Sequence, residues 1–227
     1  MDKYTQVAQA KTNKKVWRLF IESILAGFFI AVGGYASQMA ITLGFPKTIS
    51  ALIFPAGLIM VVLTGSELFT GNCLIIGPAC KNLVKWDKAA KVLGVSYAGN
   101  LAGALIMVCM ARVIASDSYI EIASQAANAK ISMGVAELLV RAILCNILVC
   151  VAVWMAINTT ETTGKILACA IPVFVFVFCG FEHSIANMYF LPIGAGANIA
   201  LIFRQIAIVT IGNMVGGAVV GIALECR

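Results

Sequence analysis

Six long apolar stretches limit what this chain can fold into. Each has about 20 residues or more, the length a helix needs to cross the hydrocarbon core of a bilayer. Of the 227 residues, 61% are apolar and 11% are charged, an excess that so short a chain cannot bury in a soluble interior. The stretches also lack the alternation of barrel strands. We predict an all-α membrane protein with six transmembrane helices, at residues 19–43, 48–80, 92–115, 133–157, 165–192 and 205–224.

Basic residues gather beside the ends of these stretches. The net charge of +6 would suggest nucleic acid as a partner of a soluble protein, but here the positive-inside rule accounts for it. We therefore expect a multi-pass protein of the inner (cytoplasmic) membrane, embedded in the lipid bilayer, with both termini cytoplasmic and no nucleic-acid partner. The residues that set this orientation are in the amino-terminal tail and after the second stretch: Lys3, Lys11, Lys14, Lys15, Arg18, Lys81, Lys85, Lys88 and Lys91.

The chain contains an internal repeat. At an offset of 115 residues, the segment 65–72 (GSELFTGN) aligns with 180–187 (GFEHSIAN), and both match G-x-E-x-x-x-[GA]-N. Because each copy holds three spans, an odd number, the second copy must enter the membrane from the opposite side. We predict a cytoplasmic segment at 1–18, a first three-helix repeat at 19–115, an outer connection at 116–132 and a second, inverted repeat at 133–227.

The second and fifth stretches are longer than one crossing requires, and each carries the repeat motif in its interior. Proline removes a backbone donor and disrupts the preceding turn, and these stretches contain Pro55, Pro78, Pro172 and Pro192. Irregular backbone at membrane depth is tolerated where it is buried in protein or lines a watery cavity. We therefore predict that helices two and five are broken beside a permeation path.

Four glutamates occur in or beside the apolar stretches as repeat-related pairs. Glu22 corresponds to Glu137, and Glu67 to Glu182. Since an intramembrane carboxylate is costly, we expect these four side chains to be structural and to accept hydrogen bonds from backbone N–H groups freed at the breaks. A proton relay is the alternative. Asn72 and Asn187 are expected to hold the restarting helices together.

His183 is the only histidine, and its repeat counterpart is Leu68. The repeat therefore does not require it, and we expect a role in the pore, either donating a hydrogen bond to an anion or giving a proton to a weak-acid anion. Arg141 adds a cation within the fourth stretch; it can serve the anion or form a salt bridge with Glu137 one turn away. Further polar lining is expected from Thr70, Asn146 and Asn213.

At these motifs the chain resembles the formate/nitrite transporter family, pentameric anion channels with an aquaporin-like fold. The resemblance rests on GFEHSIANMYFLP at 180–192, GSELFT at 65–70, CNILVCVAVWM from Cys145 and TIGNMVGGA from Thr210. It implies a path through each protomer of a homopentamer, past a central site made by His183 and Thr70.

The resemblance also implies site residues. One constriction is expected near Leu68 and Phe176 and another near Leu58, with Phe54 as a further candidate. Asn146 and Asn213 match asparagines that face the path, and Lys130 matches a basic residue of the outer vestibule. Arg141 matches a residue that is basic in nitrite and hydrosulfide channels and apolar in formate channels.

The sequence thus predicts a channel for small monovalent anions, namely hydrosulfide, nitrite or formate, with no cofactor. A channel for neutral small solutes on the same fold is the alternative. A metal site or membrane enzyme built on Glu182 and His183 is disfavoured, because the chain has one histidine and no paired nucleophile and base. The cysteines form no C-x-x-C pair and are expected to pack as small apolar residues.

Overall fold

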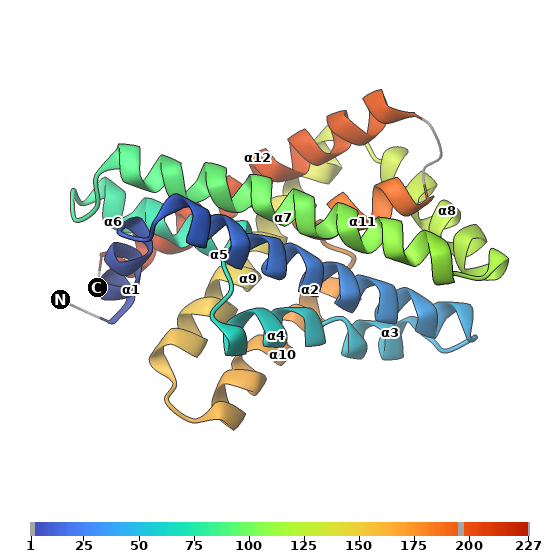
Figure 1. Ribbon diagram of the computed structural model, residues 1–227, viewed down its shortest axis with the longest axis horizontal. Helices are drawn as coiled ribbons and strands as arrows, with labels where there is room; N and C mark the ends of the chain where they lie inside the picture. Colours follow the sequence, from blue (N-terminus) through green and yellow to red (C-terminus); the bar gives the residue numbers. More distant parts are fainter. Residues whose placement is uncertain (1–2, 195–197, 227) are drawn as a thin grey trace.

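The computed structural model describes residues 3–194 and 198–226, and it contains only helices in these ranges (Figure 1). The helices, in chain order, are α1 (Lys3–Thr12), α2 (Val16–Thr42), α3 (Lys47–Ile53), α4 (Ala56–Thr64), α5 (Phe69–Asn72), the 3₁₀ turn η1 (Cys73–Ile75), α6 (Ile76–Cys80), α7 (Trp86–Ile114), α8 (Asp117–Ile131), α9 (Val135–Asn158), α10 (Thr162–Phe178), α11 (Ser184–Gly194) and α12 (Ile199–Leu224). The predicted all-helical fold is confirmed.

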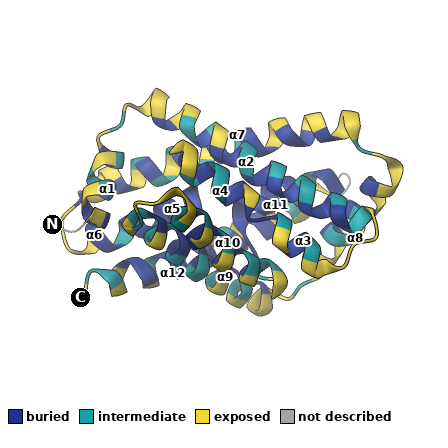
Figure 2. Ribbon diagram, turned by 90° about the horizontal axis from the view of Figure 1, so that it is seen from below, coloured by how far each residue is buried: buried dark blue, intermediate teal, exposed yellow. Residues whose placement is uncertain are grey.

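Several helices are suited to a membrane. Five helical segments in the described residues are long and apolar enough to cross one: Val16–Thr42, Lys47–Thr64, Trp86–Ile114, Val135–Asn158 and Ile199–Leu224. Two apolar segments are shorter, Phe69–Cys80 and Thr162–Phe178. Exposed residues lie along the outer faces of the helices, around a buried centre (Figure 2). Large apolar side chains such as Trp17, Val113 and Phe203 are more than half exposed there, as expected for a surface that faces lipid or a partner.

The ends of the bundle differ. Both termini, α1 and α6 lie at one end, and α8 lies at the other (Figure 1). The predicted connection at 116–132 contains α8, a helix of 15 residues. Ser116 caps it, because its Oγ accepts a hydrogen bond from Tyr119 N at 3.3 Å. α8 packs on α11 and α2 at this end of the bundle.

The chain leaves the helical conformation at two equivalent places. After α4, Gly65 adopts a φ of +69°, and α5 begins only at Phe69. After α10, Gly180 adopts a φ of +68°, and α11 begins at Ser184. Positive φ is accessible to glycine at little cost, which explains why both copies of the motif begin with it. We call residues 65–68 the first break and residues 180–183 the second break.

Close helix packing explains other glycines of the repeat. α2 packs on α7 and α9 packs on α12. A Cβ on Gly103 of α7 would lie 2.0 Å from Ile24 O, and a Cβ on Gly216 of α12 would lie 2.3 Å from Ile143 O. These glycines therefore let two helices touch within each half of the molecule. Gly221 instead faces the α5–α6 segment, near Leu74 O, and so joins the two halves.

Candidate functional site

Two cavities approach each other from opposite ends of the bundle. The first, which we call the α1 cavity, has a volume of about 410 Å³ and is bordered by α1, α4, the first break, α9 and α10. The second, the α8 cavity, has a volume of about 530 Å³ and is bordered by α2, α3, α8, the second break and α11. Since α1 and α8 lie at opposite ends (Figure 1), the cavities open toward opposite sides of the molecule.

A small void of about 10 Å³, the central gap, lies between the two cavities. This is about the smallest cavity volume that can hold one water molecule. Its lining is apolar except for the histidine: Ile30, Phe54, Leu58, Leu68, Val149, Val173, Phe176 and His183. The gap therefore closes the route between the cavities in this structure.

All four predicted constriction residues line the central gap. Their grouping differs from the one that the resemblance implied, which placed Leu68 with Phe176. Leu58 and Leu68 also border the α1 cavity, whereas Phe54 and Phe176 also border the α8 cavity. The rings of Phe54 and Phe176 meet edge to face at 5.8 Å. One pair therefore narrows each side of the gap.

His183 joins the two halves of the molecule. It is the last residue of the second break, and its Nε2 lies 2.9 Å from Thr70 Oγ1 at the start of α5. Its Nδ1 accepts a hydrogen bond from Ala186 N at 3.1 Å. An acceptor nitrogen carries no proton, so this contact assigns the ring proton to Nε2, which then donates to Thr70 Oγ1. The predicted pairing of His183 with Thr70 is present in the structure.

A hydrogen-bonding clamp built on asparagine holds each break. Asn213 Nδ2 donates to Ala142 O and Glu182 O at 2.8 and 2.9 Å, and its Oδ1 accepts from Ser184 N at 2.8 Å. Asn100 repeats this pattern at the first break: Nδ2 donates to Ser23 O and Glu67 O, and Oδ1 accepts from Phe69 N. At each break the amide satisfies one carbonyl and one N–H that the broken helix leaves unpaired, and it ties them to a carbonyl of a neighbouring unbroken helix, α9 or α2.

Two asparagines expected to face the path do not border either cavity or the central gap among the described residues. Asn213 is committed to the clamp. Asn146 donates from Nδ2 to Thr70 O at 3.2 Å and to Asn213 O at 2.6 Å, and its buried Oδ1 has no partner in the described part of the chain. Asn146 therefore braces the backbone of Thr70, whose side chain contacts His183.

At the second break, Glu182 forms a buried ion pair. Lys130 Nζ lies 2.7 Å from Glu182 Oε1, and Asn187 Nδ2 donates to Glu182 Oε2 at 2.7 Å. Lys130 Nζ also lies 5.7 Å from the centre of the Phe190 ring. All four side chains border the α8 cavity. Lys130 thus brings a positive charge from α8 into the cavity that His183 faces.

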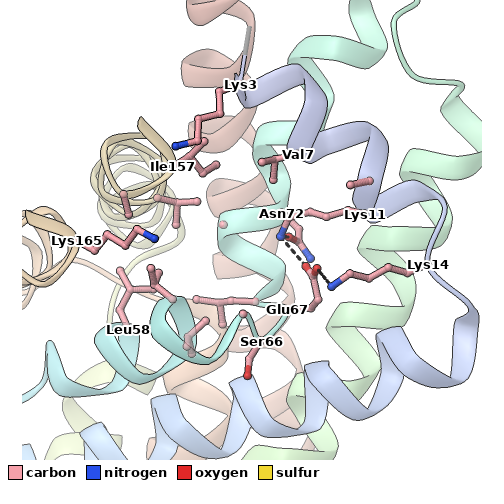
Figure 3. Close-up of a pocket in the computed structure, with 18 residues that line it drawn as sticks. Lys3, Val7, Lys11, Lys14, Leu58, Ser66, Glu67, Asn72, Ile157 and Lys165 are labelled. Carbon is pink, nitrogen blue, oxygen red and sulfur yellow. Dashed lines mark hydrogen bonds and ion pairs between the residues drawn. The ribbon is translucent and has the colours of Figure 1, made fainter. Parts of the chain in front are cut away.

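At the first break, Glu67 binds two lysines of the amino-terminal segment. Lys11 Nζ lies 2.6 Å from Glu67 Oε2 and Lys14 Nζ lies 2.8 Å from Glu67 Oε1, as Figure 3 shows from the cavity side. Lys11 Nζ also donates to Asn72 Oδ1 at 2.7 Å. Each break therefore combines a glutamate, a lysine and an asparagine. The carboxylates of both breaks bind lysines rather than freed backbone N–H groups, so that part of the prediction was wrong; the asparagine clamps serve those N–H groups instead.

The remaining repeat-related glutamates also form ion pairs. Glu22 binds Lys14 and Arg18 at 2.5 and 2.8 Å. Glu137 binds Arg141, whose Nη2 lies 2.8 Å from Glu137 Oε1. Arg141 also donates from Nη1 to Gly180 O at 2.7 Å. The salt bridge to Glu137 is thus present, and Arg141 additionally braces the second break.

Sequence reasoning missed four contributors. Asn100 was not among the predicted site residues, although the pair Gly99-Asn100 in α7 matches Gly212-Asn213 in α12 and could have indicated its clamp. Lys11 and Lys14 were treated only as topological charges, and no sequence signal places a tail against a break. Gln38 of α2 borders the α8 cavity, and its buried Nε2 has no partner in the described ranges.

Lys14 gives a test of how α1 is held. Burial disfavours its charged form, but the hydrogen bonds and charges of Glu22 and Glu67 outweigh burial and raise the pKa of Lys14 above its usual value of 10.5. The stabilisation from this ammonium is therefore fully present below pH 10.5 and is lost only as the pH rises through the higher value.

We expect Lys14→Met to loosen α1 by about 1–2 kcal/mol, because Glu67 and Glu22 each lose a charged hydrogen-bond donor. Hydrogen exchange of the α1 amides at pH 7 should then be about 5- to 30-fold faster than in the wild-type protein. Lys15→Met is the matched control, since Lys15 is exposed and lies outside these ion pairs. Equal exchange rates in the two variants would contradict a role of Lys14 in docking α1.

Comparisons with known proteins found similar sequences and similar overall structures. The family model described as "Formate/nitrite transporter" matches residues 1–226. A probable formate transporter of Methanothermobacter thermautotrophicus is 34% identical, over 94% of this chain and 89% of that protein. A solved "FNT family ion channel" superposes with a TM-score of 0.86 at 27% identity, covering 97% of this chain and 94% of the other. A solved "Pentameric formate channel with formate bound" superposes with a TM-score of 0.77 at 30% identity, covering 90% and 93%.

Proposed function

The chain belongs to the formate/nitrite transporter family, and we propose that it conducts small monovalent anions, with hydrosulfide, nitrite and formate as the candidates, past His183. A member of this family is a transporter and not an enzyme. One observation carries the proposal: two cavities from opposite ends of the bundle meet at an apolar gap in which His183 offers the polar contact. A bare anion cannot cross such a gap without a hydrogen-bond donor or a proton.

His183 suits the role of a hydrogen-bond donor to the anion rather than that of a proton donor. Its Nδ1 accepts from Ala186 N, so adding a second proton to the ring would place two N–H groups against each other. The neutral ring instead has a proton on Nε2 that points to Thr70 Oγ1. An entering anion takes the place of this contact and accepts hydrogen bonds from His183 Nε2 and from the Thr70 hydroxyl.

The charged residues around the path favour anions over neutral solutes. Lys130 borders the α8 cavity, and Arg141 lies beside the second break, bound to Gly180 O. Each of the two is paired with a glutamate, Glu182 or Glu137, so in our proposal they favour anions as charged hydrogen-bond donors near the path rather than as a net positive charge. The alternative, a neutral-solute channel on the same fold, predicts a flux that does not respond to removal of either charge. In our proposal the breaks are held by the four glutamates and by four asparagines, namely Glu22, Glu67, Glu137, Glu182, Asn72, Asn187, Asn100 and Asn213.

The membrane arrangement belongs to the same proposal. The six crossings are α2, the α3–α6 segment with its break, α7, α9, the α10–α11 pair with its break, and α12, as two inverted repeats at 19–115 and 133–227. In this arrangement the termini, α1 and the whole segment 1–18 lie on the cytoplasmic side of the membrane. The connection 116–132 lies on the outer side. The solved pentameric formate channel supports a homopentamer, and we propose one path through each protomer.

Widening the central gap tests the path. We expect Leu68→Ala and Phe176→Ala each to raise formate or nitrite flux in liposomes severalfold, because each removes a side chain that borders the gap and lowers the desolvation barrier. Leu83→Ala, at an exposed leucine in the connection after α6, is the matched control and should leave flux unchanged. If the gap variants conduct like Leu83→Ala, the anion does not pass between Leu68 and Phe176.

A further inference from the structure

The α1 cavity has more positive charge than the proposed transport needs. It is bordered by four lysines, Lys3, Lys11, Lys14 and Lys165, and by a single glutamate, Glu67, a net excess of three positive charges. Figure 3 shows these lysines reaching the cavity from three sides. Glu67 pairs with Lys11 and Lys14. Lys3 and Lys165 form no ion pair with the residues that the structure describes.

A buried donor points to the same ligand chemistry. Asn72 borders the α1 cavity and is 3% exposed. Its Oδ1 accepts from Lys11 Nζ, which fixes the orientation of the amide and leaves Nδ2 as the free end. That Nδ2 is buried and has no hydrogen-bond partner in the described ranges. A buried donor without a partner is costly, and a ligand oxygen would satisfy it.

The sizes of the cavity and of the central gap indicate that such a ligand would bind in the cavity and would not pass through the protein. A volume of about 410 Å³ is typical of sites for small organic or phosphoryl compounds. The cavity ends at Leu58 and Leu68, and the gap beyond them holds about 10 Å³. A ligand that carries two or three negative charges and fills the cavity would stop there and block the path.

We propose that the α1 cavity is a binding site for a soluble polyvalent anion with phosphoryl groups, held by Lys3, Lys165 and Asn72 Nδ2, and that its occupancy inhibits flux. A monovalent substrate ion neutralises one of the three excess charges, whereas a diphosphate neutralises two or more. The binding of this anion does not depend on the proposed function, whereas the inhibition of flux rests on the proposed anion transport.

The test uses pyrophosphate as the probe, with the purified full chain in detergent, at near-physiological salt and without divalent cations. Titration calorimetry should show one site per chain with sub-millimolar affinity. The double variant Lys3→Gln with Lys165→Gln should bind at least about tenfold more weakly, because it loses two cationic contacts. Lys85→Gln is the control for charge, since Lys85 is exposed and borders neither cavity, and it should bind as the wild-type protein does.

The second part measures flux in liposomes with pyrophosphate on both faces, so that the orientation of the inserted protein does not matter. Pyrophosphate should lower monovalent anion flux severalfold in the wild-type protein and in Lys85→Gln, and the ratio of flux with and without it should approach one in the double variant. Absence of binding, or equal binding by the double variant, would overturn the inference. Normal binding by a protein that conducts no anion would instead refute the proposed transport and leave the site in place.

Discussion

Replacing Asn213 with leucine is expected to remove more stability than any other single change considered above. The side chain forms three hydrogen bonds, to Ala142 O, Glu182 O and Ser184 N, and all are buried. Leucine fills a similar volume but leaves Glu182 O and Ser184 N unpaired at a cost of about 1–3 kcal/mol each, and it also loses the bond to the helical carbonyl of Ala142. The total approaches the whole stability of a typical domain, about 5–15 kcal/mol.

Thermal unfolding of the purified protein measures this effect. We expect Asn213→Leu to lower the Tm by about 10 °C or more, or to abolish the folded protein. Asn100→Leu should behave alike, because Asn100 forms the equivalent clamp at the first break. Asn158→Leu is the matched control, since its exposed amide donates only to Trp154 O at the end of α9. If the clamp variants unfold like Asn158→Leu, the asparagines do not hold the breaks.

Replacing His183 with alanine is expected to lower anion flux by about 10- to 100-fold. The variant leaves an apolar gap with no donor on that side, and a lost hydrogen bond to an ion is worth about 1.5–3 kcal/mol. His183→Gln separates the two roles, because an amide offers an N–H near the position of Nε2 but does not titrate between pH 5 and 8. A hydrogen-bonding histidine predicts that glutamine restores much of the flux that alanine loses. A proton relay predicts that both variants are equally poor.

Uptake of formate, nitrite or hydrosulfide into liposomes measures these fluxes, at two pH values. Both variants must first be shown to fold as the wild-type protein does, by the same thermal unfolding. Equal loss in alanine and glutamine variants that fold normally would contradict the hydrogen-bonding role.

The sequence predicts much of this fold because lipid imposes strong rules. Long apolar runs become helices, since a bilayer offers backbone groups no other partner. The G-x-E motif located the two places where helix stops, at Gly65 and Gly180. The sequence did not predict α8 as a helix, because its composition is polar enough to resemble a loop.

The site was predictable only in part. His183 and Thr70 came from the motif and lie together, because the repeat brings the two restarting helices face to face. The partners of Glu67 were not predictable, since Lys11 and Lys14 come from a tail whose return to the first break depends on tertiary packing. Asn213 was expected to face the path both as a polar residue among the apolar stretches and from the resemblance, but its hydrogen bonds show a bracing role that depends on where Ser184 begins its helix.

The most direct test of the account is the uptake of formate, nitrite and hydrosulfide into liposomes that contain the wild-type protein, compared with empty liposomes. The account predicts that at least one of these anions enters much faster with the protein, and that Leu68→Trp, which fills the central gap, removes the excess. Uptake of all three anions at the rate of empty liposomes would contradict anion conduction past His183.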